Sequence, residues 1–310
     1  MLIPQSNWKQ TLPLYPWVKT INKIYSCSSI PSFYGNTLYL TSDYSGGNKE
    51  SQYDTIVFLA FDFEDSRQWE YRRQIIRKRI FKEFRKMSFK NLNDSKRKKV
   101  LPYFLDAADH FSGICTSFVI SKKIKSLCFW PEGVDDFKKA ANLKAKWNYK
   151  HLETAIRITH FCSLLIAGLS HEHQDIYWIS DEDSLFANPS YSSDIVNITS
   201  HFSSYYVKYP LGKLGIGTTK LDEGDYQTED LTLVPDLVAG ATAELATKIA
   251  QKYIGHIPMK MALSIPDNLS QKAKSIVDWL ANDSDKLKKS VLVFDIYENN
   301  QLGVFRLLLE

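Results

Sequence analysis

The sequence is poor in cysteine, and the cysteines that it has are far apart. Its 310 residues include four, Cys27, Cys115, Cys128 and Cys162, and no two of them form a short-spaced pair. This spacing excludes a disulfide framework and a thiolate zinc site built from cysteines alone. We therefore expect the cysteines to be small apolar side chains in a reducing compartment.

Long apolar runs and a secretion signal are also missing. No stretch approaches the roughly 20 apolar residues that span a bilayer, and the longest one, residues 161–169, is expected to be a buried helix. The first six residues, Met-Leu-Ile-Pro-Gln-Ser, lack the charged-then-apolar pattern of a signal peptide. These absences predict a cytoplasmic protein with no membrane partner.

Several common catalytic motifs are absent or incomplete. Gly215-Ile216-Gly217 lacks the third glycine of a dinucleotide fingerprint, and residues 46–49 lack the spacing of a P-loop. No Gly-x-Ser-x-Gly elbow supports a serine hydrolase. His171-Glu172-His173 does not have the helical spacing of a zinc protease, and no third ligand is evident. These classes are therefore disfavoured.

The composition is that of a folded protein, with 44% hydrophobic, 13% aromatic and 24% charged residues. Apolar and β-forming runs predict strands at 37–42, 54–61, 114–120, 175–180 and 214–218. Helical patterns are predicted at 65–83, 94–108, 134–146, 150–169, 190–206 and 236–252. A helix at 268–281 and a hairpin over 291–309 follow. The chain is thus expected to have three parts: an irregular arm (1–36), an α/β domain (37–255) with a basic helical insertion at about 64–110, and an extension (256–310).

Without its insertions, the predicted core has the order strand, strand, strand, helix, strand, helix, strand, helix. This order resembles the ribonuclease H-like fold, which implies a mixed five-stranded sheet with flanking helices. Acidic residues fall where that fold carries its metal ligands. Asp43 closes the first strand, Glu153 lies in the first turn of the first core helix, Asp181 closes the fourth strand, and Asp236 opens the last core helix.

A narrower resemblance rests on two segments, Asp43-Tyr44-Ser45-Gly46 and the run Leu-Thr-Leu-Val-Pro-Asp-Leu-Val-Ala-Gly-Ala at 231–241. They are similar to motifs of an uncharacterised bacterial family, the domain of unknown function 3800. The sequence departs from that family at Tyr44, where an acid is usual, and at Pro235, where alanine is usual. The resemblance covers about residues 37–255 and implies, by analogy, a role in bacterial phage defence or mobile-element biology.

The resemblance implies a catalytic set of Asp43, Glu153, Asp181 and Asp236, with Asp183 as a further metal ligand that is an alternative to Asp181. Phosphodiester cleavage with two divalent cations requires several carboxylate oxygens around metals about 3.5–4 Å apart. Mg²⁺ or Mn²⁺ is the expected cofactor. Each acid alone is also ordinary turn or helix-start chemistry, so the prediction depends on their joint order.

A dense basic segment between residues 72 and 99 is the candidate surface for RNA, DNA or a hybrid. We expect phosphate contacts from eight residues: Arg72, Arg73, Arg77, Lys78, Lys96, Arg97, Lys98 and Lys99. The alternative is an ordinary solvated helix face. The sequence therefore predicts a metal-dependent nuclease. A catalytically inactive nucleic-acid- or protein-binding module and a scaffold subunit of a larger complex stay open.

Overall fold

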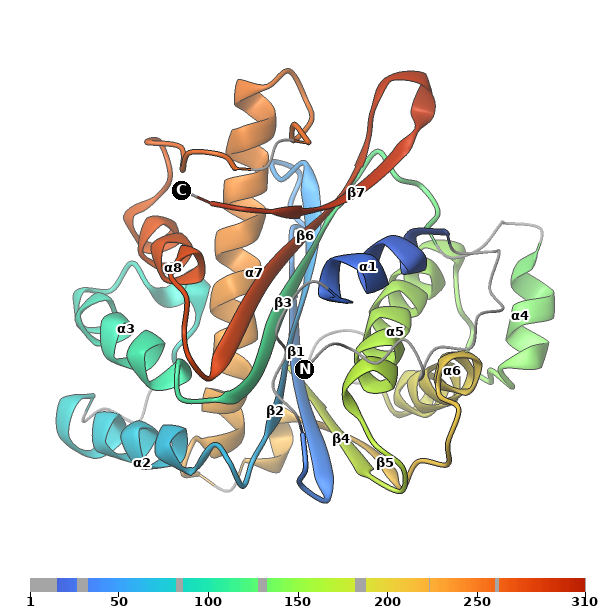
Figure 1. The fold of residues 1–310 in the computed structure, drawn as a ribbon, viewed down its shortest axis with the longest axis horizontal. Coiled ribbons are helices and arrows are strands. Elements are labelled where there is room, and N and C mark those ends of the chain that lie inside the picture. The colour runs from blue at the N-terminus through green and yellow to red at the C-terminus, as the bar shows by residue number, and fades with distance from the viewer. Residues whose placement is uncertain are drawn as a thin grey trace.

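A seven-stranded mixed sheet forms the centre of the protein (Figure 1). The computed structural model describes residues 16–26, 33–81, 86–127, 133–181, 188–222, 224–259 and 262–309. The strands lie in the order β5-β4-β1-β2-β3-β6-β7. Their bounds are β1 Thr37–Ser45, β2 Tyr53–Asp62, β3 Ser112–Ser121, β4 Asp175–Ser180, β5 Leu214–Thr218, β6 Leu287–Ile296 and β7 Leu302–Leu307.

The first five strands have the ribonuclease H-like arrangement that the sequence predicts. Strands β1, β2 and β3 form an antiparallel meander, and β4 and β5 extend it in parallel from the free edge of β1. The predicted hairpin also forms, and it continues the same sheet because β6 pairs in parallel with β3. The fold class is therefore confirmed, with two strands added to the predicted five.

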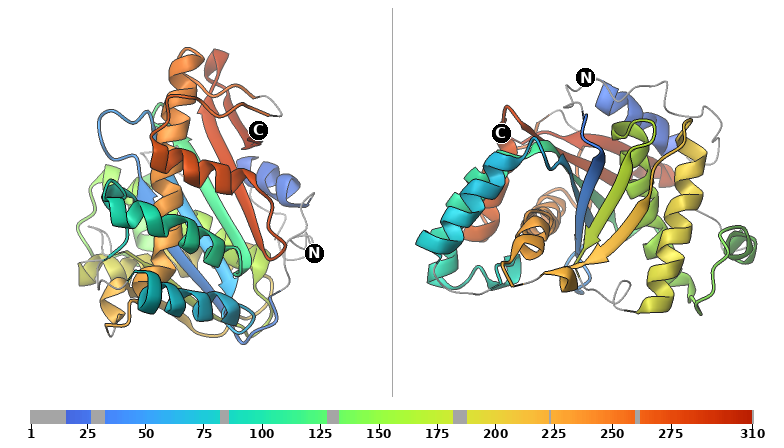
Figure 2. Two further views of the ribbon diagram at one scale, coloured as in Figure 1. Left: turned by 90° about the vertical axis from the view of Figure 1, so that its left-hand side faces the viewer. Right: turned by 90° about the horizontal axis from the view of Figure 1, so that it is seen from below.

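Helices cover both faces of this sheet (Figure 2). One face carries α1 Pro16–Ser26, α5 Tyr149–Leu169 and α6 Pro189–Tyr206, with the short α4 Val134–Ala140 beyond them. The other carries α2 Arg67–Ile75, the π-helix η2 Ile76–Ile80, α3 Ser95–Ala108, α7 Gln227–Lys252 and α8 Gln271–Ala281. Single 3₁₀ turns are η3 Phe89–Asn91, η5 Thr219–Leu221 and η6 Glu298–Asn300. Helix α1 lies within the segment expected to be irregular, so that part of the arm prediction is wrong.

Successive residues of a strand point to opposite faces, and this alternation separates two cores. On β2, Phe58 and Ala60 pack towards α5, while Val57 and Leu59 pack towards α7. Both faces are covered, so nearly every residue of β2 is buried. This explains why the strand is a continuous apolar run in the sequence.

Helix α5 is the buried helix expected from the apolar run at 161–169. Among the described residues it is the one helix with the length and hydropathy of a membrane span, and 94% of its most apolar window is buried inside the protein. Asn148 caps its start by accepting a hydrogen bond from the His151 amide at 2.9 Å. Its apolar character is accounted for by packing against the sheet.

Helix α7 begins at Gln227, nine residues before the predicted start. The Asp222 carboxylate accepts hydrogen bonds from the Thr228 and Glu229 amides and so caps the helix there. Pro235 was expected just outside the helix but lies inside it. Proline has no N–H to donate to the carbonyl four residues earlier, that of Leu231. That carbonyl instead accepts a hydrogen bond from Thr41 Oγ1 of β1 at 3.0 Å.

Candidate functional site

The register of the parallel pair β1–β4 brings two of the predicted acids to the same sheet edge. Ser42 is the partner of Ser180, and Asp43 and Asp181 are the next residues along these strands. Asp43 still lies within β1, opposite Val57 of β2, whereas Asp181 directly follows β4. The expectation that Asp43 closes its strand is therefore wrong by two residues, while the expected proximity of the two strand positions is confirmed.

Asp236 reaches the same place from α7. It occupies the middle of this helix rather than its start, because the helix continues through Pro235. Hydrogen bonds from Thr41 to Leu231 and from Thr55 Oγ1 to the Ala239 carbonyl (2.9 Å) fix α7 across β1 and β2. Asp43 is on the same face of β1 as Thr41, and a hydrogen bond joins the carboxyl groups of Asp43 and Asp236.

The electrostatics of this pair show how close the carboxyl groups are. Burial raises the pKa of Asp43 well above its ordinary value, and the negative charges of Asp236 and Asp181 raise it further. Burial also raises the pKa of Asp236, although the Phe89 amide and the hydrogen bond from Asp43 act in the opposite direction. Two adjacent carboxylates cannot both ionise easily, so the pKa of each is raised, and that of Asp43 is raised well above its ordinary value.

A lysine neutralises the third acid. Lys86 Nζ lies 3.1 Å from Asp181 Oδ1 and 3.0 Å from Oε2 of Glu229, and Asp181 also accepts a hydrogen bond from Thr219 Oγ1 at 3.0 Å. Glu229 lies two helical turns before Asp236 on α7, so it faces the same way. Sequence reasoning missed Glu229. The seven-residue spacing to Asp236 is the signal that could have identified it, once α7 was known to extend that far.

The glycine of the 231–241 run, Gly240, has a packing role. A Cβ on Gly240 would lie 2.2 Å from the ring of Phe89, so only glycine lets this ring lie against α7. The Phe89 amide donates to Asp236 Oδ2, and its carbonyl accepts from Lys272 Nζ at 2.9 Å. Gly240 therefore helps to place a backbone donor on the candidate site.

Two predicted metal ligands do not join this group in the described structure. Glu153 accepts from Arg157 Nε at 2.8 Å and from the Leu127 amide at 2.8 Å, and it lines a cavity on the α5 face of the sheet. Asp43 and Asp236 are on the α7 face, so the expectation for Glu153 is corrected. The position of Glu153 in the sequence indicated the correct edge of the sheet, but it could not show on which face of the sheet the side chain lies. Asp183 lies outside the described residues.

Two of the arginines predicted to bind nucleic acid are buried in an internal ion-pair network. Arg73 is 2% exposed and pairs with Glu70 and Asp230, and Arg77 forms a two-pronged pair with Asp230. Burial raises the pKa of Asp230 even though both arginines lower it. This network fastens α2 and η2 to the start of α7 (Figure 1). The placement of Arg73 and Arg77 on a nucleic-acid surface is therefore corrected.

The other basic candidates lie nearer the surface. Arg72 pairs with Asp106 and Arg97 with Asp94, whereas the lysines are exposed: Lys78, Lys96, Lys98 and Lys99. Burial lowers the pKa of Lys272, and the positive charge of Lys98 lowers it further, whereas the negative charge of Asp236 raises it. The start of α3 therefore presents positive charge beside the acidic group, and a role in nucleic-acid binding stays a prediction.

No three histidine, cysteine, aspartate or glutamate side chains within the described ranges are arranged as a ready metal-binding group. The donors at the candidate site are nevertheless all carboxylates, the hard oxygen ligands that Mg²⁺ and Mn²⁺ prefer. Their mutual repulsion is the charge pattern that a divalent cation would relieve. The residues thus fit such a cation in chemical kind, and Asp181 must leave Lys86 to contribute to it.

Comparisons with known proteins give a likeness to solved structures. No protein-family model and no curated protein matches the chain, so the narrower resemblance to the domain of unknown function 3800 finds no support. Among solved structures, the chain is similar to the crystal structure of the ribonuclease H2 from Pyrococcus horikoshii OT3. The identity is 13%, the match covers 79% of this chain and 85% of that chain, and the TM-score is 0.35. A likeness of this size carries no argument about activity, and the fold class rests on the strand order described above.

Proposed function

We propose that this protein is a metal-dependent nuclease that hydrolyses phosphodiester bonds at the group formed by Asp43, Asp181 and Asp236. The observation that carries the proposal is their convergence from three separate elements, β1, the end of β4 and α7. A hydrogen bond joins two of them, and their charges act on one another. A folded protein rarely gathers several carboxylates in one place, and functional sites are where it tolerates them.

Mg²⁺ or Mn²⁺ would be held by these three carboxylates and would supply charge stabilisation and an activated water. The chain itself contributes the positions of the ligands. The Phe89 amide orients Asp236, and Thr219 orients Asp181. Lys86 neutralises the charges of Asp181 and Glu229 when no metal ion is bound. Once a metal ion occupied these carboxylates, Lys86 would be free to contact a bound phosphate.

The proposed substrate is nucleic acid, bound through its phosphates. Lys98 and Lys272 lie on the side of the acidic group that α3 and α8 provide, and Lys78, Lys96 and Lys99 extend the positive surface. Phosphate contacts position a polynucleotide without reading its sequence. We therefore propose cleavage with little base preference. The cytoplasmic location, the role in phage defence and the division into three parts stay predictions.

The second candidate function is a catalytically inactive module of the same fold that binds nucleic acid. The pairing of Lys86 with Asp181 and Glu229 favours it, because an internal cation can replace a metal permanently. In that case the basic surface would bind a polynucleotide and the acidic group would only stabilise the fold.

The decisive experiment compares degradation of single-stranded, duplex and hybrid substrates in Mg²⁺ or Mn²⁺ by the wild-type protein and Asp43→Asn. The nuclease proposal predicts cleavage by the wild type and at least about a hundred-fold slower cleavage by the variant, the scale of losing one electrostatic group. Asp54→Asn is the matched control. Asp54 is on the neighbouring strand β2 but faces the cavity on the α5 side. Equal cleavage by the wild type and Asp43→Asn would refute the proposed role of Asp43.

Binding distinguishes the two candidates. A Lys98→Ala/Lys99→Ala variant is expected to lower the slope of log affinity against log salt by about one to two, because each phosphate contact releases about one counterion. Absence of cleavage together with this salt-dependent binding would favour the inactive module. An unchanged slope would remove the start of α3 from the binding surface.

A further inference from the structure

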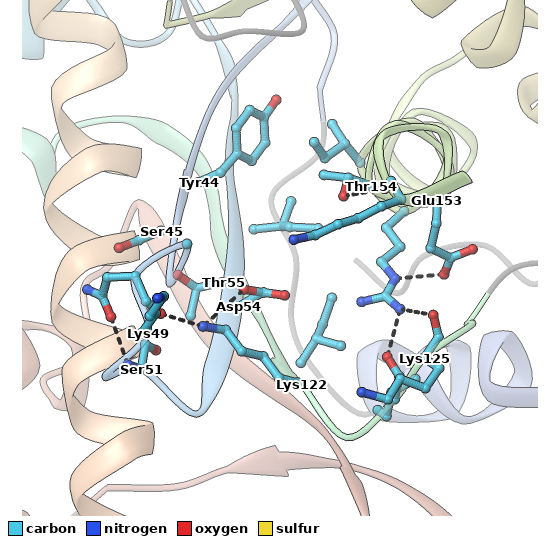
Figure 3. A pocket seen from close by; sticks show the side chains of 18 of the residues that line it. Tyr44, Ser45, Lys49, Ser51, Asp54, Thr55, Lys122, Lys125, Glu153 and Thr154 are labelled. Carbon is cyan, nitrogen blue, oxygen red and sulfur yellow. Dashed lines mark hydrogen bonds and ion pairs between the residues drawn. The ribbon is translucent and has the colours of Figure 1, made fainter. Parts of the chain in front are cut away.

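A cavity of about 800 Å³ lies on the α5 face of the sheet, behind the acidic group. Figure 3 shows residues of the β1–β2 hairpin, such as Lys49 and Asp54, on one side and Glu153 and Thr154 of α5 on the other. Lys122 and Lys125, from the segment after β3, form its lower rim in this view. Its volume is within the range of small-molecule binding sites. Because Asp43 points to the opposite face of β1, this cavity is separate from the proposed nuclease site.

A buried arginine lines the cavity and has an unused donor. The side chain of Arg157 is 9% exposed, and its Nε donates to Glu153 while its Nη2 donates to the Ile124 carbonyl at 2.9 Å. Glu153 is itself held by the Leu127 amide, so the guanidinium is fixed in position. No described residue accepts a hydrogen bond from Nη1. A rigid guanidinium with a free donor is the group that proteins use to recognise phosphate.

The rest of the cavity wall adds positive charge. Five basic side chains line it against two acidic ones, and both acids are already compensated, Asp54 by Lys122 and Glu153 by Arg157. The charges of Lys122, Arg157 and Lys150 all lower the pKa of Asp54, which burial raises overall, so these cations face a common space. Neither Lys125 nor Lys150 forms an ion pair with a described residue. The remaining field is therefore positive and favours an anionic ligand.

The floor of the cavity is apolar. Ile56, Ile120, Ile124 and Ile158 are each less than a tenth exposed, and they line the cavity together with Tyr44 and Tyr149. A free phosphate ion would not cover this apolar surface, which would stay exposed to water. A neutral apolar ligand would not contact the basic side chains. A ligand that carries a phosphate on a flat apolar body uses both features.

We propose that this cavity binds a nucleotide, with its phosphate on Arg157 Nη1 and on Lys125 and Lys150, and its base against the isoleucine floor. The inference goes beyond the proposed nuclease activity and does not depend on it. A free mononucleotide and the 5′-phosphorylated end of a polynucleotide present the same chemistry, so both sources are tested.

The test is a calorimetric titration of the full-length protein with adenosine monophosphate, adenosine, inorganic phosphate and a short 5′-phosphorylated oligonucleotide. We expect the monophosphate to bind at least ten-fold more tightly than adenosine or phosphate. We expect Lys125→Ala/Lys150→Ala to weaken its binding at least ten-fold, while Lys274→Ala, an exposed lysine of α8, leaves it unchanged. Both lysines of the test variant are exposed, so loss of folding does not complicate the comparison.

Two further measurements decide the assignment. Arg157→Lys keeps the positive charge but removes Nη1, and it is expected to weaken monophosphate binding while Asp43→Asn does not, which separates this site from the nuclease site. Tighter binding of the oligonucleotide than of the monophosphate, with the same loss in the double-lysine variant, identifies the polynucleotide end as the source. Absence of binding by both phosphorylated probes, or binding that is equal in wild type and double-lysine variant, overturns the proposal.

Discussion

The contact between Thr41 and the Leu231 carbonyl yields the sharpest prediction about stability. Pro235 cannot donate to this carbonyl, which is buried on α7, and Thr41 Oγ1 takes over at 3.0 Å. Thr41→Val keeps the shape of the side chain but leaves the carbonyl without a donor. An unsatisfied buried group of this kind costs about 1–3 kcal/mol. We therefore expect the free energy of unfolding to fall by about that amount.

A double-mutant cycle isolates this hydrogen bond from other effects of the valine. In Pro235→Ala the new amide can donate to the Leu231 carbonyl, as in a regular helix, so the hydroxyl of Thr41 is no longer needed. The Pro235→Ala variant should itself be more stable, by up to about 3 kcal/mol, since proline is unfavourable inside a helix. In this background Thr41→Val should cost about 1–2 kcal/mol less than in the wild type.

Urea denaturation followed by circular dichroism measures all four proteins under the same conditions. If the hydroxyl of Thr41 compensates for the proline, the coupling energy between positions 41 and 235 is well above the roughly 0.3–0.5 kcal/mol expected of independent sites. Additive effects within that margin would show that the hydroxyl does not compensate for the proline.

Three other predictions concern the site and the core. Gly240→Ala forces the Phe89 ring away from α7, because its Cβ would lie 2.2 Å from that ring; we expect a loss of about 1–3 kcal/mol in urea unfolding together with slower cleavage. Burial lowers the pKa of His160 to about 3, so the unfolded chain binds this proton below about pH 6.5 while the folded one does not. The contribution of neutral His160 to the free energy of unfolding is complete above that pH and is lost as the pH falls towards 3. About 2 kcal/mol is lost by pH 5. We expect His160→Phe to flatten this part of a curve of unfolding free energy against pH. Lys86→Ala removes the cation that occupies Asp181, so Mn²⁺ should bind several-fold more tightly in a calorimetric titration; weaker binding would mean that Lys86 helps to organise the site.

The order of strands and helices could be predicted because apolar patterning records burial directly. The continuous run of β2 and the buried α5 are examples, since each is covered on all sides. Several element ends were misplaced, among them the end of β1, predicted at position 42 and found at Ser45, and the start of α7, predicted at position 236 and found at Gln227. A threonine of β1 donates to the carbonyl that Pro235 leaves without a donor in α7, and such a contact between distant residues leaves no local pattern.

The candidate site could be predicted only in part, for a related reason. Asp43 and Asp181 were identified because strand register follows from the order of elements. Glu153 was misplaced because its position at the start of a helix indicates an edge of the sheet but does not show on which face of the sheet that helix packs. Arg73 and Arg77 appear in the sequence as members of a basic run, and their burial depends on Asp230, more than 150 positions later in the chain.

The most direct test of a metal site at Asp43, Asp181 and Asp236 is a titration of the protein with Mn²⁺, followed by electron paramagnetic resonance of the unbound ion. We expect the wild type to bind Mn²⁺, and we expect Asp43→Asn and Asp236→Asn each to weaken this binding at least ten-fold while Asp54→Asn leaves it unchanged. Equal Mn²⁺ affinity in all four proteins would contradict a metal site at these carboxylates.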